Sequence, residues 1–587
     1  GNFFKNPEDF RLYMNARYNN LLSRGEGVGG GHTSMFRFDN GSDNFAGWRY
    51  PYGSAPHPDL MQHENSGIAP ESNQIWTGAY KEIRNINFLM DNIDKAPERT
   101  PRINHYIGEA FFARAFNYFN LLKAFGGVPY FDRVLGITSE ELYDTRESRD
   151  FIASKIMEDL DSAITLLNWK GKGEASAARI NKESALLMKT RVGLYEGSWE
   201  YYHGQKNTPF ALSGKDGTSF LNEAVEAGEA LMEYQGDQIY TGPGGKEYSA
   251  LFNQTNYQNI SGAFLFRHYD FDLGNAFGGS VDARGGMTHG AVKSYLMEDG
   301  KPEALSSVSY DYTNQNSLIH SRDPRLYQTI YAPDRGPFNE TFDFVIGINV
   351  RGLIYGRVED TFTGYKVYKG LPKEHVADSQ SNMDDLLLRY GEALLNYAEA
   401  KAILGEITQT DIDKTVNVLR NRVGMVPMNL GEVSSWNVSY AESEGFDPAA
   451  SNIVNEIRRE RRVELMFEGT RKDDLKRWAV YENVVNGWKP LGAYYQEHAD
   501  YFNNTDNLEE AGIIEREWPD YAVEIGKDID VLGEYINPWW RFADFSPSGR
   551  GYYIDPERDY LQAVPKEEIE LYREKGNVTL EQNPGWF

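Results

Sequence analysis

Residues 102 to 129 carry the longest helix signal in the chain and constrain its fold more than any other stretch. Apolar residues recur there at three- and four-residue steps, and a stripe of phenylalanines runs beside them. Gly126 and Gly127 end the helix, and Pro129 prevents its return. A helix that is apolar on most sides must be surrounded by others, so this stretch predicts the core of a helical domain.

The same periodicity predicts further helices, which follow one another in pairs. They cover residues 7–22, 75–93, 146–168, 181–202, 219–234, 291–298, 384–405, 411–423 and 451–468. Small residues such as Ala224, Ala227 and Ala230 permit tight stacking, as in tetratricopeptide repeats, although the strict repeat signature is not met. Between about 235 and 380, short strand-like runs and loops replace the helices. We therefore predict a mostly α fold with tetratricopeptide-like helix pairs, long irregular loop insertions and a few short strands.

The composition narrows the classes of function. Sixty basic and 87 acidic residues among 587 give a net charge of -27, which repels polyanions, so we expect no nucleic-acid partner. The absence of cysteine excludes disulfides, thiolate nucleophiles and cysteine-ligated metals. No apolar run approaches the roughly 20 residues of a membrane span. Aromatic residues reach 14%, which favours ligand recognition or packing within loops.

The familiar sequence motifs for catalysis are missing. The sequence has no H-E-x-x-H or G-x-S-x-G motif, and its one G-x-G-x-x-G match follows a helix and precedes a loop. We expect no cofactor and no metal. A loop with Asn503, Asn504, Asp506 and Glu509 offers calcium ligands but lacks the helix-loop-helix pattern, so a solvated loop is the preferred interpretation.

Charged residues on the predicted helices leave one enzymatic alternative open, since a glycosidase needs only two carboxylates. Arg389, Glu392, Asn396 and Glu399 run down one face of the predicted helix 384–405. We interpret them as a paired network between stacked helices, in which Arg389 and Glu392 can also pair along the helix. The dense, balanced charges of 456–464 have the same interpretation, that of helix docking.

Several segments, in order along the chain, resemble the SusD/RagB family, the nutrient-binding surface lipoproteins of Bacteroidetes outer membranes, of the starch-utilisation-system type. The matching residues are Ser42-Asp43, Trp76, Tyr80 and Asn85; Glu109, Arg114-Ala115, Phe119, Leu122 and Phe125 to Pro129; Met297, Asp299-Gly300 and Arg322 to Leu326; Glu460 to Arg462, Glu464-Leu465, Phe467 to Gly469, Arg471, Asp474-Leu475 and Arg477-Trp478; and Tyr560-Leu561, Pro565, Glu568-Ile569 and Gln582 to Trp586. The resemblance spans the chain. It implies a single SusD-like domain, 1–587, with an N-terminal part of about 1–235, a loop-rich insertion of about 236–380 and a C-terminal part of about 381–587.

The resemblance also implies a function. It predicts non-catalytic binding of an oligosaccharide or polysaccharide at the cell surface and its delivery to a SusC-like TonB-dependent outer-membrane transporter. It places the protein on the extracellular face of the outer membrane, held by an N-terminal lipid anchor whose cysteine would lie upstream of this chain. Peptide uptake, as in RagB-like members, is the first alternative, and a helical glycoside hydrolase with paired carboxylates is the second.

A loop from residue 32 to residue 74, rich in Asp, Asn, Gly, Trp and Tyr, is the best candidate for the ligand site. Flat aromatic rings cover the apolar face of a sugar, and carboxylates, amides and guanidiniums take its hydroxyls. We predict that Trp76 is the stacking platform, and the resemblance adds a second wall from later loops. The predicted site residues are Asp39, Asn40, Asp43, Asn44, Trp48, Arg49, Tyr50, Glu71, Asn73, Trp76, Tyr269, Phe277, Met287 and His289.

Overall fold

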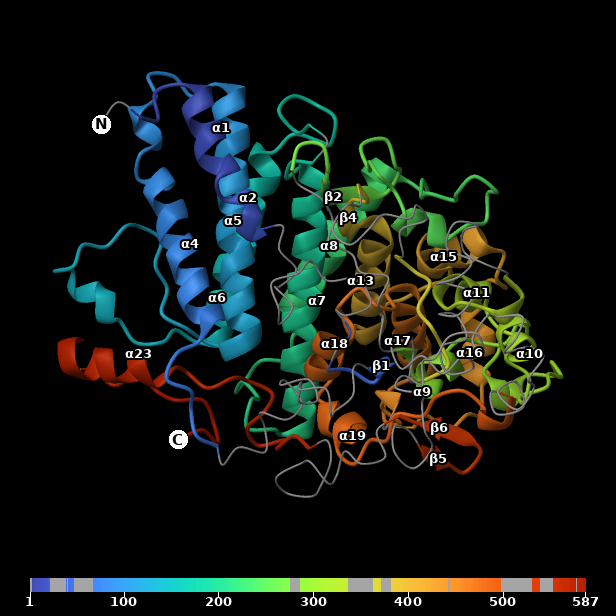
Figure 1. Ribbon diagram of the computed structural model, residues 1–587. Coiled ribbons are helices and arrows are strands. Elements are labelled where there is room, and N and C mark those ends of the chain that lie inside the picture. The colour runs from blue at the N-terminus through green and yellow to red at the C-terminus, as the bar shows by residue number, and fades with distance from the viewer. Residues whose placement is uncertain are drawn as a thin grey trace, which may run out of the picture.

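Helices make up most of the regular structure that the computed structural model describes (Figure 1). The described residues are 3–21, 39, 41–46, 67–176, 178–274, 286–335, 363–370, 382–441, 444–497, 530–538, 553–576 and 578–587. Within them the strands form two-stranded antiparallel sheets, β1 with β3, β2 with β4 and β5 with β6. The predicted mostly α fold is confirmed.

The first part of the chain forms a layer of helices that pack side by side. They are α1 (Pro7–Asn15), α2 (Tyr18–Leu21), α4 (Gln74–Met90), α5 (Pro101–Phe125), α6 (Arg149–Leu166), α7 (Lys182–Lys206) and α8 (Thr218–Gln235). Of these, α4 to α8 are long, and α1 and α2 are short. Each of α5, α6, α7 and α8 contacts the helix before it, which gives the predicted helix pairs (Figure 1). Thr100 caps α5, and Gly126, at a φ of 75°, ends it, because this left-handed backbone costs glycine little.

The middle of the chain has only short elements. They are β2 (Ala263–Arg267), β3 (Gly286–Met287), α9 (His289–Lys293), α10 (Gln315–His320) and α11 (Pro324–Thr329), after β1 (Phe45–Ala46) from the early loop. The helix predicted for 291–298 is therefore shorter and begins earlier, since Thr288 caps α9 through its side chain. Turns of 3₁₀ helix join these elements.

Helices resume towards the C-terminus. They are α13 (Tyr390–Ile403), α14 (Gln409–Lys414), α15 (Val416–Val423), α16 (Leu430–Ser435), α17 (Asn452–Glu464), α18 (Arg471–Arg477), α19 (Tyr481–Val485) and α23 (Lys566–Leu571), with β4 (Asp385–Arg389), β5 (Asp530–Leu532) and β6 (Tyr535–Asn537) among them. The helix predicted for 384–405 is wrong in its first turn. Leu386 and Leu388 alternate inward there, and their backbone pairs with β2, so this segment is a strand.

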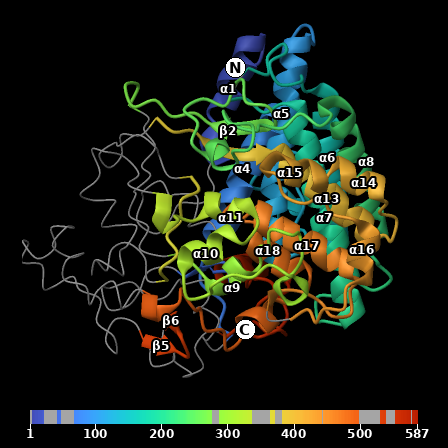
Figure 2. The same cartoon turned by 90° about the vertical axis from the view of Figure 1, so that its right-hand side faces the viewer.

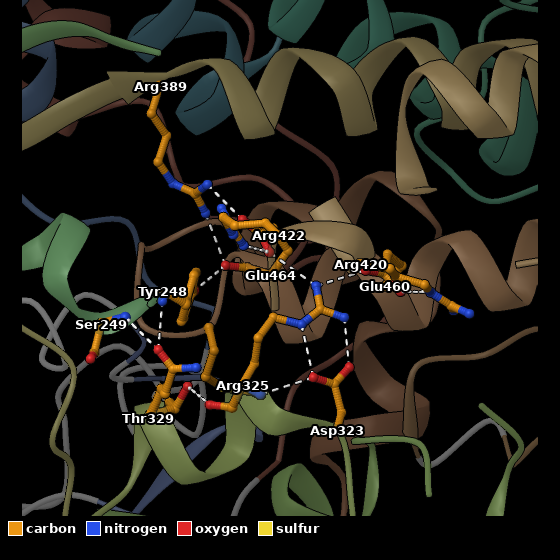
Figure 3. Close-up of polar contacts among 12 residues, drawn as sticks. Tyr248, Ser249, Asp323, Arg325, Thr329, Arg389, Arg420, Arg422, Glu460 and Glu464 are labelled. Carbon is orange, nitrogen blue, oxygen red and sulfur yellow. Dashed lines mark hydrogen bonds and ion pairs between the residues drawn. The ribbon is translucent and has the colours of Figure 1, made fainter. Parts of the chain in front are cut away.

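A buried ion-pair network joins α17 to the elements around it (Figure 3). Glu464 accepts hydrogen bonds from Arg389 at 2.8 Å, Arg422 at 2.7 Å and Arg325 at 3.0 Å. These arginines come from β4, α15 and α11. Three guanidiniums around one carboxylate outweigh the cost of its burial, and the pKa of Glu464 lies well below its usual range. The interpretation of the α17 charges as helix docking is confirmed.

The other three residues of the charged face predicted for 384–405 bind neighbouring helices. Glu392 pairs with Arg191 of α7 at 2.6 Å, and Glu399 pairs with Arg477 of α18 at 2.6 Å. Asn396 accepts a hydrogen bond of 2.6 Å from α17. This face therefore forms a network between stacked helices, as predicted. The expected pairing of Arg389 with Glu392 along the helix is wrong, because Arg389 of β4 binds Glu464 and Glu392 of α13 binds Arg191.

Candidate functional site: a ladder of aromatic rings

Three predicted site residues from the early loop lie inside the protein. The carboxylate of Asp43 accepts hydrogen bonds from Arg462 at 2.7 Å and Arg471 at 2.8 Å. Asn44 accepts from Arg462 at 2.8 Å and donates to Asp39 at 2.9 Å. Burial raises the pKa of a carboxyl, but the two guanidiniums hold the pKa of Asp43 below its usual value. These side chains fasten the early loop to α17 and α18, which corrects their assignment to a ligand site.

Trp76 is also part of the core. Only 3% of it is exposed, and its ring packs edge-on against Phe125 at 5.1 Å and beside Tyr80 at 5.2 Å. Asn73 caps α4 by accepting hydrogen bonds from the backbone amides of residues 75 and 76. A ring enclosed by other rings cannot receive a sugar, so the prediction that Trp76 is the stacking platform is wrong.

The remaining predicted residues divide into buried, exposed and undescribed positions. Tyr269 is 3% exposed and packs with Met383, and Met287 is buried where β3 pairs with Phe45 of β1. The side chain of Glu71 is 71% exposed and lies 3.8 Å from Lys566. Asn40, Trp48, Arg49, Tyr50 and Phe277 lie outside the described residues, as do the predicted calcium ligands Asn503, Asn504, Asp506 and Glu509.

His289 is the predicted site residue that the structure brings together with other partly exposed rings. It begins α9, and its ring lies 4.4 Å from the ring of Tyr535 and 6.1 Å from the ring of Tyr365. Its Nδ1 forms a hydrogen bond of 3.0 Å with the Tyr365 hydroxyl. Burial lowers the pKa of His289 to about 4, so the imidazole is neutral at physiological pH.

Two further tyrosines continue this row of rings. The centroid of Tyr494 lies 6.4 Å from that of Tyr535 and 5.8 Å from that of Tyr312. Tyr312 is 45% exposed, Tyr494 and Tyr535 are partly exposed, and Tyr365 is buried beneath His289. We call these five residues the aromatic ladder: His289, Tyr312, Tyr365, Tyr494 and Tyr535. Its four tyrosines could not be predicted from the sequence, because they come from separate irregular segments with no shared periodicity.

Backbone hydrogen bonds fix the ladder at one end of the molecule, where α9 lies beside the β5–β6 hairpin (Figures 1 and 2). The amide of His289 donates to Leu491 at 2.7 Å, and the amide of Gly492 donates to Ile536 of β6 at 2.7 Å. Residue 492 must be glycine, since a Cβ there would lie 2.3 Å from the carbonyl oxygen of Thr363. His289, Tyr365, Tyr494 and Tyr535 therefore lie on paired backbone.

The chemistry of the ladder suits a ligand with flat apolar faces and many hydroxyls. Within the described part of the chain, the hydroxyls of Tyr312 and Tyr535 have no hydrogen-bond partner, and each can donate or accept. Aromatic rings with a polar edge suit ligands that have an apolar face and remain partly exposed to solvent. No group of three or more His, Asp or Glu that could hold a metal occurs among the described residues.

Comparison with known proteins identifies the family. The model of the SusD family matches residues 229–586. The chain belongs to the SusD family. A second model, "Starch-binding associating with outer membrane", matches residues 32–194, so the resemblance seen in the sequence is confirmed in both parts of the chain. SusD family members are non-catalytic binding proteins of an outer-membrane-associated family, which confirms the prediction that this chain is not an enzyme.

Individual SusD-like proteins match most of the chain. SusD-like protein P38 of Formosa agariphila is 24% identical, over 81% of this chain and 84% of its own. A SusD-like carbohydrate-binding protein of Bacteroides fragilis superposes with a TM-score of 0.70 at 22% identity, covering 97% of this chain and 99% of its own. A laminarin-binding SusD-like protein has a TM-score of 0.53 at 17% identity, covering 99% and 100%. These similarities show a shared fold. None of the helices described here is long and apolar enough to cross a bilayer.

Proposed function

We propose that this SusD family protein binds an oligosaccharide or polysaccharide at the cell surface and passes it, unchanged, to a SusC-like TonB-dependent transporter. An N-terminal lipid anchor upstream of this chain would hold it on the extracellular face of the outer membrane. We also propose that residues 1–587 act as one SusD-like domain. Two solved relatives with this fold are described as carbohydrate-binding and laminarin-binding, which supports a glycan ligand.

The observation that carries the proposal is the aromatic ladder. It presents partly exposed rings in a row, 4.4 to 6.4 Å apart, with tyrosine hydroxyls among them. If stacking contributes roughly 1–3 kcal/mol per ring, as it does for bases on aromatic side chains, two rings and a few hydrogen bonds give a Kd of about millimolar to ten micromolar. A polymer presents many copies of the bound unit, so a weak site of this kind can capture the polymer and still release it readily. The undescribed site residues Asn40, Trp48, Arg49, Tyr50 and Phe277 remain predicted contributors.

Calorimetry with a panel of soluble glycans and mixed peptides tests the proposal, with reducing-sugar release assayed in the same samples. Tyr535→Ala and Tyr312→Ala should each weaken glycan binding about tenfold, since each removes one stacking ring. Tyr234→Ala is the matched control. Tyr234 lies on α8, is also 45% exposed, and stacks on Trp169 instead of on the ladder. Its removal should leave the affinity unchanged.

The outcomes separate the alternatives. Glycan binding without product, lost in the ladder variants and kept in Tyr234→Ala, supports the proposal. Affinity for peptides alone would favour RagB-like peptide uptake. Release of reducing ends would favour the alternative that the protein is a glycoside hydrolase. Delivery is tested separately, by co-purification of the lipid-anchored protein with a SusC-like transporter from native outer membranes. Recovery without any transporter would count against the delivery step.

A further inference from the structure

Arg458 of α17 is a buried cation whose side chain has no hydrogen-bond partner among the described residues. Its exposed fraction is 0%, and Nε, Nη1 and Nη2 are all unsatisfied. Its Cζ atom lies 4.4 Å from the ring centroid of Trp478 and 4.6 Å from that of Tyr202. Aromatic faces attract a cation, but they do not satisfy the N–H groups at the edge of a planar guanidinium. Burying such a charge is costly unless another group pairs with it.

Two arginines near Arg458 each keep a free donor as well. Within the described ranges, Nη1 of Arg462, one turn further along α17, and Nη1 of Arg471 in α18 are buried and have no partner. Both side chains bind Asp43 Oδ2, at 2.7 Å and 2.9 Å. Arg471 also lies 5.9 Å from the ring of Trp478, which Arg458 contacts. Unsatisfied donors of three guanidiniums therefore gather where α17 meets α18.

The carboxylates nearest to Trp478 already serve other donors. Glu399 accepts hydrogen bonds from Arg477 at 2.6 Å and from the indole of Trp478 at 2.7 Å. Asp474 accepts from Arg461 at 2.8 Å and from Arg477 at 2.9 Å. Neither carboxylate binds Arg458, although the charge of Arg458 helps to lower the pKa of Glu399.

The charges around this junction do not balance. Among the described residues, buried guanidiniums outnumber buried carboxylates by one: Arg458, Arg461, Arg462, Arg471 and Arg477 stand against Asp39, Asp43, Glu399 and Asp474. Two further groups that act on Arg462, Glu444 and Arg459, carry opposite charges and leave this excess unchanged. Burial and the charge of Arg471 lower the pKa of Arg462 to about 10, in keeping with an excess of positive charge.

We propose that a small monovalent inorganic anion, such as chloride, binds at the junction of α17 and α18, with Arg458 as its main donor and Arg462 and Arg471 beside it. Buried water satisfies free N–H groups but leaves the excess charge, whereas one monovalent anion answers both. The anion site contains no residue of the aromatic ladder, so its presence does not depend on the proposed function.

Crystals grown with sodium bromide as the only halide test the site directly, because bromide scatters anomalously near its absorption edge. We expect an anomalous peak within hydrogen-bonding distance of the Arg458 guanidinium. Ordered water there without an anomalous signal overturns the proposal. Peaks confined to the protein surface would show an adventitious ion only and would overturn it equally.

Stability in solution gives a second readout. At constant ionic strength, each tenfold replacement of gluconate by chloride should raise the unfolding midpoint by about 1 °C once chloride exceeds its Kd, because only the folded state binds the ion. Arg458→Met keeps an apolar side chain of similar length beside the two rings but removes the charge and the donors. Its midpoint should not respond to chloride.

Arg99→Met is the matched control. It removes an exposed arginine and should keep the full response to chloride. Equal midpoints in chloride and gluconate for the unmodified protein overturn the proposal, and an undiminished response in Arg458→Met overturns the role of Arg458. If Arg458→Met does not fold, the bromide crystals and the chloride response of the unmodified protein still decide.

Discussion

Arg462 Nη2 lies 2.7 Å from Asp43 Oδ2, and both side chains are buried. This contact joins α17 to the early loop, two parts of the chain that are far apart in sequence. Arg471 of α18 binds the same carboxylate at 2.8 Å. One aspartate therefore binds two guanidiniums and holds the early loop against the helical frame.

Asp43→Asn should destabilise the protein by about 3–5 kcal/mol, because removing one partner of a buried ion pair leaves the other charge uncompensated. Urea unfolding followed by circular dichroism measures the loss. Asp94→Asn, at an exposed position after α4, is the control and should change the free energy of unfolding by no more than about 0.5 kcal/mol. Similar midpoints for the two variants would show that the Asp43 contacts add little.

The stability of the protein should fall as the pH drops from about 4.5 to 2, in part because of Glu468. Burial opposes its ionisation, yet Arg389 and Lys369 lower its pKa from 4.5 to about 2. The unfolded chain therefore binds this proton first as the pH falls, so the contribution of Glu468 is complete above 4.5 and is lost below it. Unfolding midpoints measured across this range should decline less steeply for Glu468→Gln, which starts from a lower stability at pH 7. Parallel curves would contradict this assignment.

Trp76→Ala should cost about 3–5 kcal/mol of stability, the usual range for removing a large aromatic side chain from a core. Its affinity for glycan, measured at a temperature where the variant is still folded, should match that of the unmodified protein. Trp76→Phe should recover much of the stability. A specific loss of binding in a stably folded Trp76→Ala protein would instead restore Trp76 to the ligand site.

Gly492→Ala should weaken glycan binding several-fold, since its Cβ would push against the carbonyl oxygen of Thr363 and shift the strand pairing that carries Tyr494 and Tyr535. Gly78→Ala is the control: it lies on α4, and a Cβ there meets nothing within 4 Å. Titration of both variants with the same glycan decides the point. If Gly492→Ala binds normally, the rings do not depend on this close approach.

The helices and their charged faces could be predicted from the sequence because long periodic patterns determine them locally. The α5 pattern, 102 to 125, matches the observed helix Pro101–Phe125 closely. The Arg and Glu residues of α17 can be interpreted as structural from the sequence, because opposite charges alternate along a helix that docks on its neighbours. In each case the residue pattern that determines the structure lies within one segment of the sequence.

The candidate site could not be predicted in the same way, because tertiary contacts decide which aromatic residues are exposed. Trp76 enters a helix from a polar loop, which indicated a surface ring, but Phe125 and Tyr80 close over it. The first residues of the helix predicted for 384–405 instead form the strand β4, because their backbone pairs with β2. Tyr494 and Tyr535 meet through one bridge between distant segments, a contact without any local signature.

The rings of the ladder come from residues 289 to 535, whereas the contacts between successive helices from α4 to α8 are formed within the first 235 residues. Contacts between distant segments close late, after the entropy of the intervening loops has been lost. Helical circular dichroism can therefore recover during refolding well before the ladder exists. Ligand binding is accordingly a stricter probe of complete folding than helix content, and partly refolded or proteolytically nicked preparations should have a native-like spectrum but fewer binding sites per chain.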